Sequence, residues 1–115
     1  MNFLQETCED ITRSGHTPDQ IVFIGSEASG HQCTWEEFQL LANIEYDDGF
    51  GAQEIAIDLI IVFKDGAKMW RHGYDGSECW RYSKPFKLPH TKKPIQRLRV
   101  SNEGVGWCSL AELNP

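Results

Sequence analysis

The stretch of the chain whose residue types could do chemistry is WRHGYDGSECWRY, residues 70–82. Its Asp-Gly pair is a strong signal for a two-residue hairpin loop, in which positions whose numbers sum to 151 face each other. His72 then lies opposite Cys79, at a Cβ separation of roughly 5 Å. The pair could act as base and nucleophile, but a reactive thiolate also needs an electropositive pocket and an oxyanion donor. Because the sequence shows neither, a small Cys-His enzyme is only the second alternative function, and no catalytic residue is assigned.

The same register sets each tryptophan of the stretch opposite an arginine. Trp70 faces Arg81, and Arg71 faces Trp80, and a cation over an indole ring contributes about 0.5–1 kcal/mol at an exposed site. A three-residue loop would shift the register by one and set Trp70 against Trp80 instead. Two interpretations stay open: a cross-strand ladder that stabilises the sheet, or an exposed aromatic patch that binds a partner.

The preceding hairpin decides which of these side chains faces the core. A second Asp-Gly signal, at residues 65–66, predicts another two-residue loop and places Ile61 beside Trp70. Trp80 and Tyr82 then fall on the opposite face, where a partner could reach them. Trp70 shares the apolar face of the preceding strand, which is formed by Ile57, Leu59, Ile61 and Phe63.

The elements that position these residues follow from hydrophobic periodicity and composition. Apolar stripes predict helices over residues 2–14 and 35–46, the second of which opens with a capping box from Thr34 to Glu37. β-branched and aromatic runs predict strands over residues 21–24, 55–63, 68–73 and 78–83, and the alternation of residues 95–100 predicts a late edge strand. The expected fold is α+β: one domain over residues 1–115, with a three- to five-stranded antiparallel sheet (meander 55–83) and two helices. Helix 35–46 is expected to cover one face.

The charge of the chain is polarised. The net charge is −6, yet residues 1–83 carry 15 acids against 5 Lys/Arg, while residues 84–101 carry basic residues and no acid. The Pro-containing segment 84–96 is expected to be a basic arm. Basic side chains neutralise phosphates, so nucleic-acid binding through residues 84–99 is the first alternative function, although the acidic remainder disfavours it. The residues concerned are Lys84, Lys87, Lys92, Lys93, Arg97 and Arg99.

A glycine-rich loop, Asp47-Asp48-Gly49-Phe50-Gly51, follows the second predicted helix. A phosphate cradle needs the opposite order, with the loop leading into a helix, so nucleotide binding is disfavoured. Phe50 stands between two glycines that allow a tight fold-back, and it is either tucked under the loop or presented to a partner.

The cysteines and the N-terminal residues indicate the cellular compartment in which the protein is expected. The four cysteines show no CxxC spacing, and the first residues lack the basic and apolar regions of a secretory signal. A cytoplasmic protein with reduced thiols is therefore expected. No apolar run approaches the roughly 20 residues of a membrane span, and no zinc or calcium spacing occurs. No cofactor, metal or membrane association is expected.

Four segments together resemble a group of small, uncharacterised proteins of tailed bacteriophages and prophages. They are TPDQIVFIGS (residues 17–26), CTWEEF (33–38), YDDGFGAQEI (46–55) and YDGSECW (74–80). The resemblance covers roughly residues 15–95, and it implies a phage accessory protein without a particular activity. The expected function is therefore non-enzymatic binding of a host or phage protein. The candidate contacts are Trp80, Tyr82, Arg71, Asp47, Asp48 and Phe50.

Overall fold

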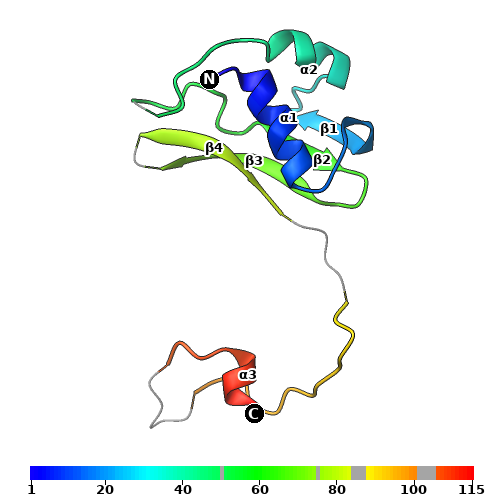
Figure 1. Ribbon diagram of the computed structural model, residues 1–115, viewed down its shortest axis with the longest axis vertical. Helices are drawn as coiled ribbons and strands as arrows, with labels where there is room; N and C mark the ends of the chain where they lie inside the picture. Colours follow the sequence, from blue (N-terminus) through cyan, green and yellow to red (C-terminus); the bar gives the residue numbers. More distant parts are fainter. Residues whose placement is uncertain (50, 75, 84–87, 101–105) are drawn as a thin grey trace.

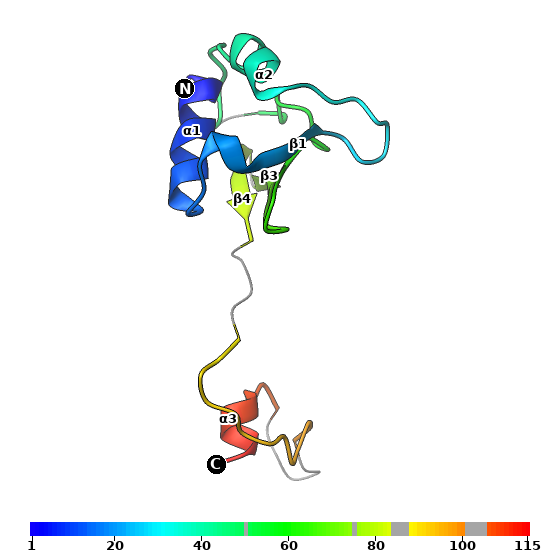
Figure 2. The same cartoon turned by 90° about the vertical axis from the view of Figure 1, so that its right-hand side faces the viewer.

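The computed structural model describes residues 1–49, 51–74, 76–83, 88–100 and 106–115. Four strands form one antiparallel sheet in the order β1-β2-β3-β4, and α1 and α2 share one of its faces (Figures 1 and 2). The α+β fold with an antiparallel meander is thereby confirmed. The elements are α1 (Phe3–Arg13), the 3-10 turn η1 (Pro18–Gln20), β1 (Ile21–Gly25), α2 (Trp35–Leu41), β2 (Ile60–Phe63), β3 (Lys68–Tyr74), β4 (Ser77–Tyr82) and α3 (Leu110–Leu113).

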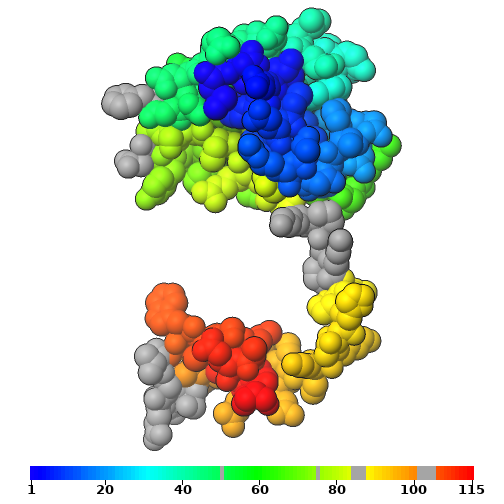
Figure 3. All heavy atoms as spheres, viewed as in Figure 1, coloured from blue at the N-terminus to red at the C-terminus, as the bar shows by residue number. Residues whose placement is uncertain are grey.

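Helix α1 lies across the sheet and buries one stripe of its surface. The Asn2 side chain accepts the Gln5 N–H at its start, which satisfies one of the orphan amides of the first turn. Phe3, Thr7 and Ile11, spaced four residues apart, are all buried. In the space-filling view α1 covers the centre of the body, with side chains of β4 visible below it (Figure 3).

Helix α2 begins where the sequence predicts and ends earlier. Thr34 and Glu37 form the expected capping box, but the helix stops at Leu41 and not at residue 46. The carbonyls of Ala42 and Ile44 instead accept the N–H groups of Leu4 and Phe3, at 2.9 and 3.0 Å. Those amides belong to the first turn of α1 and have no partner within their own helix, so the chain after α2 supplies one.

The β2–β3 hairpin corrects the predicted register. Phe63 N–H donates to the Ala67 carbonyl and Gly66 N–H to the Phe63 carbonyl, which closes a three-residue loop with Gly66 at φ +86°. Such loops place glycine in the left-handed region. The partners are therefore Ile61 with Met69 and Ile60 with Trp70, one residue away from the predicted pairing of Ile61 with Trp70. A slip of one residue exchanges the two faces of a strand, so Trp70 leaves the core.

Strand β2 is also shorter than predicted, because it begins at Ile60 and not at residue 55. Ile57, expected on the core face, is 75% exposed, and Leu59 is only partly buried. The core centres on Phe3 of α1, whose ring contacts Phe38 of α2 and Trp80 of β4, with centroids 5.9 and 5.8 Å away. Both helices thus pack on the same face of the sheet.

The described part of the C-terminal region, residues 88–100 and 106–115, carries α3. Ser109 caps this short helix, and the Asn114 carboxamide accepts the N–H groups of Gln96 and Arg97, both at 2.8 Å. The edge strand predicted over residues 95–100 is not formed. An alternating pattern needs a neighbouring strand edge, and the amides here bond to a side chain instead. That the whole chain forms one domain stays a prediction. Among the described residues no helix is long and apolar enough to span a bilayer.

Candidate functional site

A buried ionic cluster lies under α1, on the inner face of β3 and β4. The side chain of Arg71 is 0% exposed, and its Nη2 donates to Glu78 Oε1 at 2.8 Å and to the Tyr46 hydroxyl at 3.2 Å. Its Nη1 lies 3.6 Å from Glu6 Oε1. The Tyr46 hydroxyl in turn donates to the Glu6 carboxylate at 2.5 Å. One guanidinium is therefore shared by two carboxylates and a phenol.

Aromatic rings surround the same guanidinium. Its central carbon is 5.0 Å from the ring centroids of both Phe3 and Trp80 and 5.8 Å from that of Tyr46. The Trp80 indole N–H donates to Thr7 Oγ1 at 2.9 Å, and the Thr7 hydroxyl donates to the Phe3 carbonyl. The predicted Arg-over-Trp pairing thus occurs between Arg71 and Trp80, in the interior of the protein and not on its surface.

Burial perturbs the ionisable groups of the cluster. Desolvation raises the pKa of Glu6 above its ordinary value, although the Tyr46 hydrogen bond and Arg71 oppose this shift. Desolvation and the hydrogen bond to Glu6 raise the pKa of Tyr46, so its hydroxyl stays protonated. Burial works against the charge of Arg71, yet hydrogen bonds to Glu78 and Tyr46 outweigh it and raise the pKa.

The cluster also fastens the loop before β2 to the sheet. The Glu78 carboxylate accepts the N–H groups of Glu54 at 2.6 Å and Ile55 at 3.2 Å, and the Glu78 N–H donates to the Asp48 carbonyl at 2.8 Å. Asp48, residues 54–55 and Arg71 of β3 therefore all bond to Glu78, the first through the Glu78 backbone N–H and the others through the Glu78 carboxylate. Because Arg71 and Glu78 are sealed from solvent, this arrangement stabilises the fold and offers no access to a substrate.

These contacts overturn the face assignment made from the sequence. Arg71 and Trp80, expected on a partner-accessible face, are each only 5% exposed, and Tyr82 is half-buried on the same inner face. Trp70, expected in the core, is 36% exposed on the outer face. The β3–β4 register itself was predicted correctly, with Tyr74 opposite Ser77 and six pairs in all. The error came from the loop between β2 and β3, whose extra residue exchanged the faces.

The remaining predicted residues are placed in separate parts of the chain. The Asp47 side chain accepts the Gly49 N–H at 3.0 Å, and Asp48 contributes its carbonyl to Glu78, so both acids organise the loop. Phe50, Lys84 and Lys87 lie outside the described residues. The described basic residues of the predicted nucleic-acid-binding segment 84–99 are all exposed. They are Lys92, Lys93, Arg97 and Arg99.

His72 and Cys79 are cross-strand partners, as predicted. Cys79 is exposed and His72 is half-buried, on the outer face of the sheet. Within the described residues, no group of three or more His, Cys, Asp or Glu side chains could hold a metal ion. The two residues are therefore neighbours across the strands, but no hydrogen bond joins their side chains in the described structure, as a nucleophile and its base would need.

A second hydrogen-bonded series, Ser14-His16-Asp65, was not anticipated. Ser14 Oγ lies 3.0 Å from His16 Nδ1, and His16 Nε2 lies 2.7 Å from Asp65 Oδ2. The order serine, histidine, acid resembles a catalytic triad. However, the Ser14 hydroxyl bonds the Ile11 carbonyl at 2.7 Å as the C-cap of α1, and the His16 ring stacks on Phe63 in the core. A nucleophile buried in this way cannot reach a substrate, so the series joins α1 to the β2–β3 loop.

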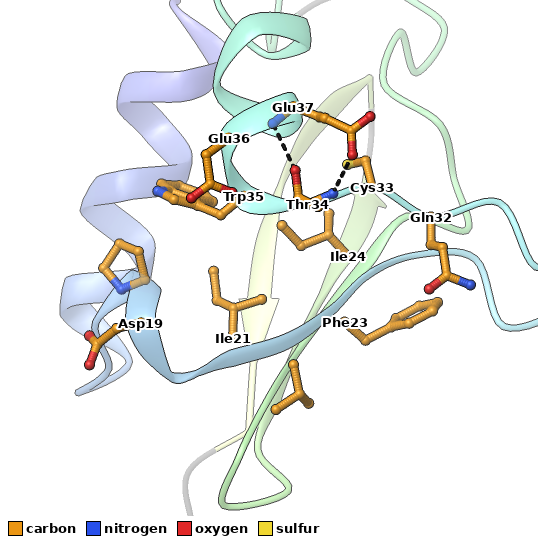
Figure 4. Close-up of a pocket in the computed structure, with 12 residues that line it drawn as sticks. Asp19, Ile21, Phe23, Ile24, Gln32, Cys33, Thr34, Trp35, Glu36 and Glu37 are labelled. Carbon is orange, nitrogen blue, oxygen red and sulfur yellow. Dashed lines mark hydrogen bonds between the residues drawn. The ribbon is translucent and has the colours of Figure 1, made fainter.

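The described surface does contain a groove, of about 500 Å³, between β1 and the start of α2 (Figure 4). Its apolar lining includes Ile21 and Phe23 of β1, which we call its floor, and Trp35 of α2 lies at one end. Its acidic residues are Asp19, Glu36 and Glu37. The groove could not be predicted from the sequence, because Asp19 is distant in the chain from Glu36 and Glu37 and no single segment contains the three acids.

The acids of the groove include two carboxylates held in their ionised form. Hydrogen bonding from the Thr17 hydroxyl lowers the pKa of Asp19, and hydrogen bonds from the Thr34 N–H and hydroxyl lower that of Glu37. Both groups are therefore charged at neutral pH. The groove is an anionic cleft with an apolar floor.

Strand β1 lies at an edge of the sheet, and only half of its outer side is covered. The segment after it folds back, so that Cys33 N–H donates to the Ile24 carbonyl at 3.0 Å and Gly25 bridges to Gln32. Residues 21–23, in the first half of the strand, line the groove instead. An uncovered stretch of edge strand is a template on which an extended chain can pair.

Comparison with known proteins found no family model, no curated protein and no solved structure that matches the chain.

Proposed function

We propose that the protein is a non-enzymatic accessory protein that binds an extended, basic segment of another protein in the groove between β1 and α2. The observation that carries this proposal is the combination of three acids, an apolar floor and an uncovered half of an edge strand in one cleft. Each feature favours the same occupant, because a strand added to a sheet edge presents alternate side chains to the pocket beside it.

The residues that line the groove indicate which side chains the bound segment should carry. Lysine or arginine side chains would face Asp19, Glu36 and Glu37, and apolar side chains between them would contact Ile21 and Phe23. Rim charges of this kind steer association and select the partner, while the apolar contacts supply most of the affinity. A cleft of this size fits a few residues of a peptide, which favours a transient complex.

The resemblance of residues 15–95 to phage and prophage proteins supports an accessory role in which the partner is a host or phage protein. The pKa shifts of Glu6, Tyr46 and Arg71 occur in a buried cluster that serves the fold, and this favours binding over catalysis.

The experiment is selection from a random peptide library against the full chain, followed by affinity measurement on the selected peptides. We expect peptides in which Lys or Arg alternates with apolar residues, with binding that weakens between 50 and 500 mM salt. Selection of acidic peptides, or of none, would contradict the proposal.

Two charge-reversal variants locate the site. Glu36→Lys changes a groove acid that takes no part in the α2 capping box, and we expect it to weaken binding of the selected peptides about tenfold. Glu27→Lys makes the same change in an exposed acid outside the groove and serves as the matched control. Equal loss in both variants would mean that overall charge, and not the groove, drives binding.

A further inference from the structure

The outer face of the sheet, opposite the helices, carries a row of rings along one strand. Outward positions of β3 alternate through Lys68, Trp70, His72 and Tyr74. Trp70 is 36% exposed and Tyr74 is 74% exposed. Successive outward residues of a strand are about 6.5–7 Å apart, so three ring-bearing residues follow one another at this backbone spacing.

The charges around this row are basic, in contrast to the rest of the body. Arg81 of β4 stands directly opposite Trp70, and Lys68 precedes the row on its own strand; both side chains are exposed. Among the described outward positions of β2, β3 and β4 none is acidic, because Glu78 points inward to Arg71. Apart from Glu78, the described acids of residues 1–83 lie on the helices, the 3-10 turn and the loops.

We infer that this face binds a single strand of nucleic acid, whose bases stack on the rings of β3 and whose phosphates contact Lys68 and Arg81. Aromatic side chains on an open sheet, flanked by cations, are the general means by which proteins hold unpaired bases. Figure 2 shows the helices on the other side of the sheet, so they leave this surface free.

Other occupants fit less well. A second copy of the chain packed face to face would bring Lys68 and Arg81 against the same cations of its partner, which like-charge repulsion disfavours. An acidic peptide would neutralise the cations but offers no flat groups at the spacing of the rings. A duplex hides its bases from all three rings.

The test is fluorescence anisotropy of the full chain with four labelled probes. They are dT15, rU15, the duplex of dT15 with dA15, and a poly-glutamate peptide of similar length. We expect binding of at least one single strand at 50 mM salt, in preference to the duplex and the peptide. Two phosphate contacts give a salt slope of about −1.4, which corresponds to roughly a sevenfold loss of affinity between 50 and 200 mM salt. No binding of either single strand, or equal binding of poly-glutamate, overturns the inference.

Two variants assign the binding to the sheet. Trp70→Ala removes one stacking surface and is expected to weaken binding by about tenfold or more. Tyr74→Ala changes the more exposed ring and keeps the test valid if Trp70→Ala fails to fold. The matched control is Trp107→Ala, which removes a fully exposed tryptophan from the C-terminal region. Loss of binding in Trp107→Ala with no loss in Trp70→Ala and Tyr74→Ala would transfer the site to the C-terminal region and refute the inference.

Discussion

Replacement of Arg71 by methionine tests the role of the buried cluster. Methionine keeps much of the volume between Phe3 and Trp80 but removes the charge that Glu6 and Glu78 share. Both carboxylates then stay in the interior without a cation. Removing one partner of a buried pair costs about 3–5 kcal/mol, mostly as the penalty of the charge that is left behind.

The loss should depend on pH in a defined direction. Burial already raises the folded-state pKa of Glu6, and removal of Arg71 takes away an attraction that opposes this rise. A carboxyl group with a raised folded pKa adds stability below its unfolded value of 4.5 and loses it as the pH rises through the folded pKa. The deficit of Arg71→Met relative to wild type should therefore be larger at pH 7 than at pH 4.5.

The assay is urea unfolding followed by tryptophan fluorescence at both pH values. A deficit of about 3–5 kcal/mol would be a large share of the total, since small domains are stable by roughly 5–15 kcal/mol. The control is Arg13→Met, which removes the ion pairs of an exposed arginine to exposed Glu9 and to largely buried Asp10, and it should cost less than the loss of Arg71. A deficit for Arg71→Met no larger than that of the control, or one that grows as the pH falls, would refute the reasoning.

Three further results are expected. Gly25→Ala would place a Cβ 2.0 Å from the His31 carbonyl oxygen, so we expect a stability loss of roughly 2 kcal/mol or more by urea unfolding; wild-type stability would contradict the close approach. Asp65 has a pKa lowered by the Ala67 N–H and by His16, so Asp65→Asn should be less stable than wild type at pH 7. This difference should vanish as the pH falls through the lowered pKa, and a constant difference would exclude the charge as its source. Iodoacetamide should modify exposed Cys79 before Cys8, whose thiol pKa is raised by burial, as peptide mass analysis can check; the reverse order would contradict the assigned exposures.

Local signals in the sequence were sufficient for much of the fold. Capping chemistry identified the start of α2 at Thr34, because an N-cap acts within three residues of itself. The β3–β4 register is the one expected from a two-residue loop at the Asp-Gly signal, one of the two registers that the sequence left open. These features depend on neighbours in the chain, so a sequence contains what is needed to predict them.

Features that depend on distant partners could not be predicted in the same way. Helix α2 ends at Leu41 because α1 takes the carbonyls of Ala42 and Ile44, and the sequence shows no such competition. The groove unites Asp19 with Glu36 across the turn between β1 and α2. The Lys64-Asp65-Gly66 loop had the signal of a two-residue turn, and only the hydrogen bonds of Phe63 distinguish the longer form.

Both β3 and β4 contain a Trp-Arg pair, and this explains why the prediction of which hairpin face is buried depended on one residue in the β2–β3 loop. Each face of the hairpin receives one tryptophan and one arginine, Arg71 with Trp80 inside and Trp70 with Arg81 outside, so these four residues are equally compatible with either choice. The position of Glu78 distinguishes the two faces. It alternates with Cys79 so as to share the face of Arg71, where Glu6 of α1 also arrives. Arg81 on the inner face would have no strand carboxylate beside it and would be costly to bury. The acids that accompany each arginine therefore select which tryptophan is sealed in the core and which remains on the surface.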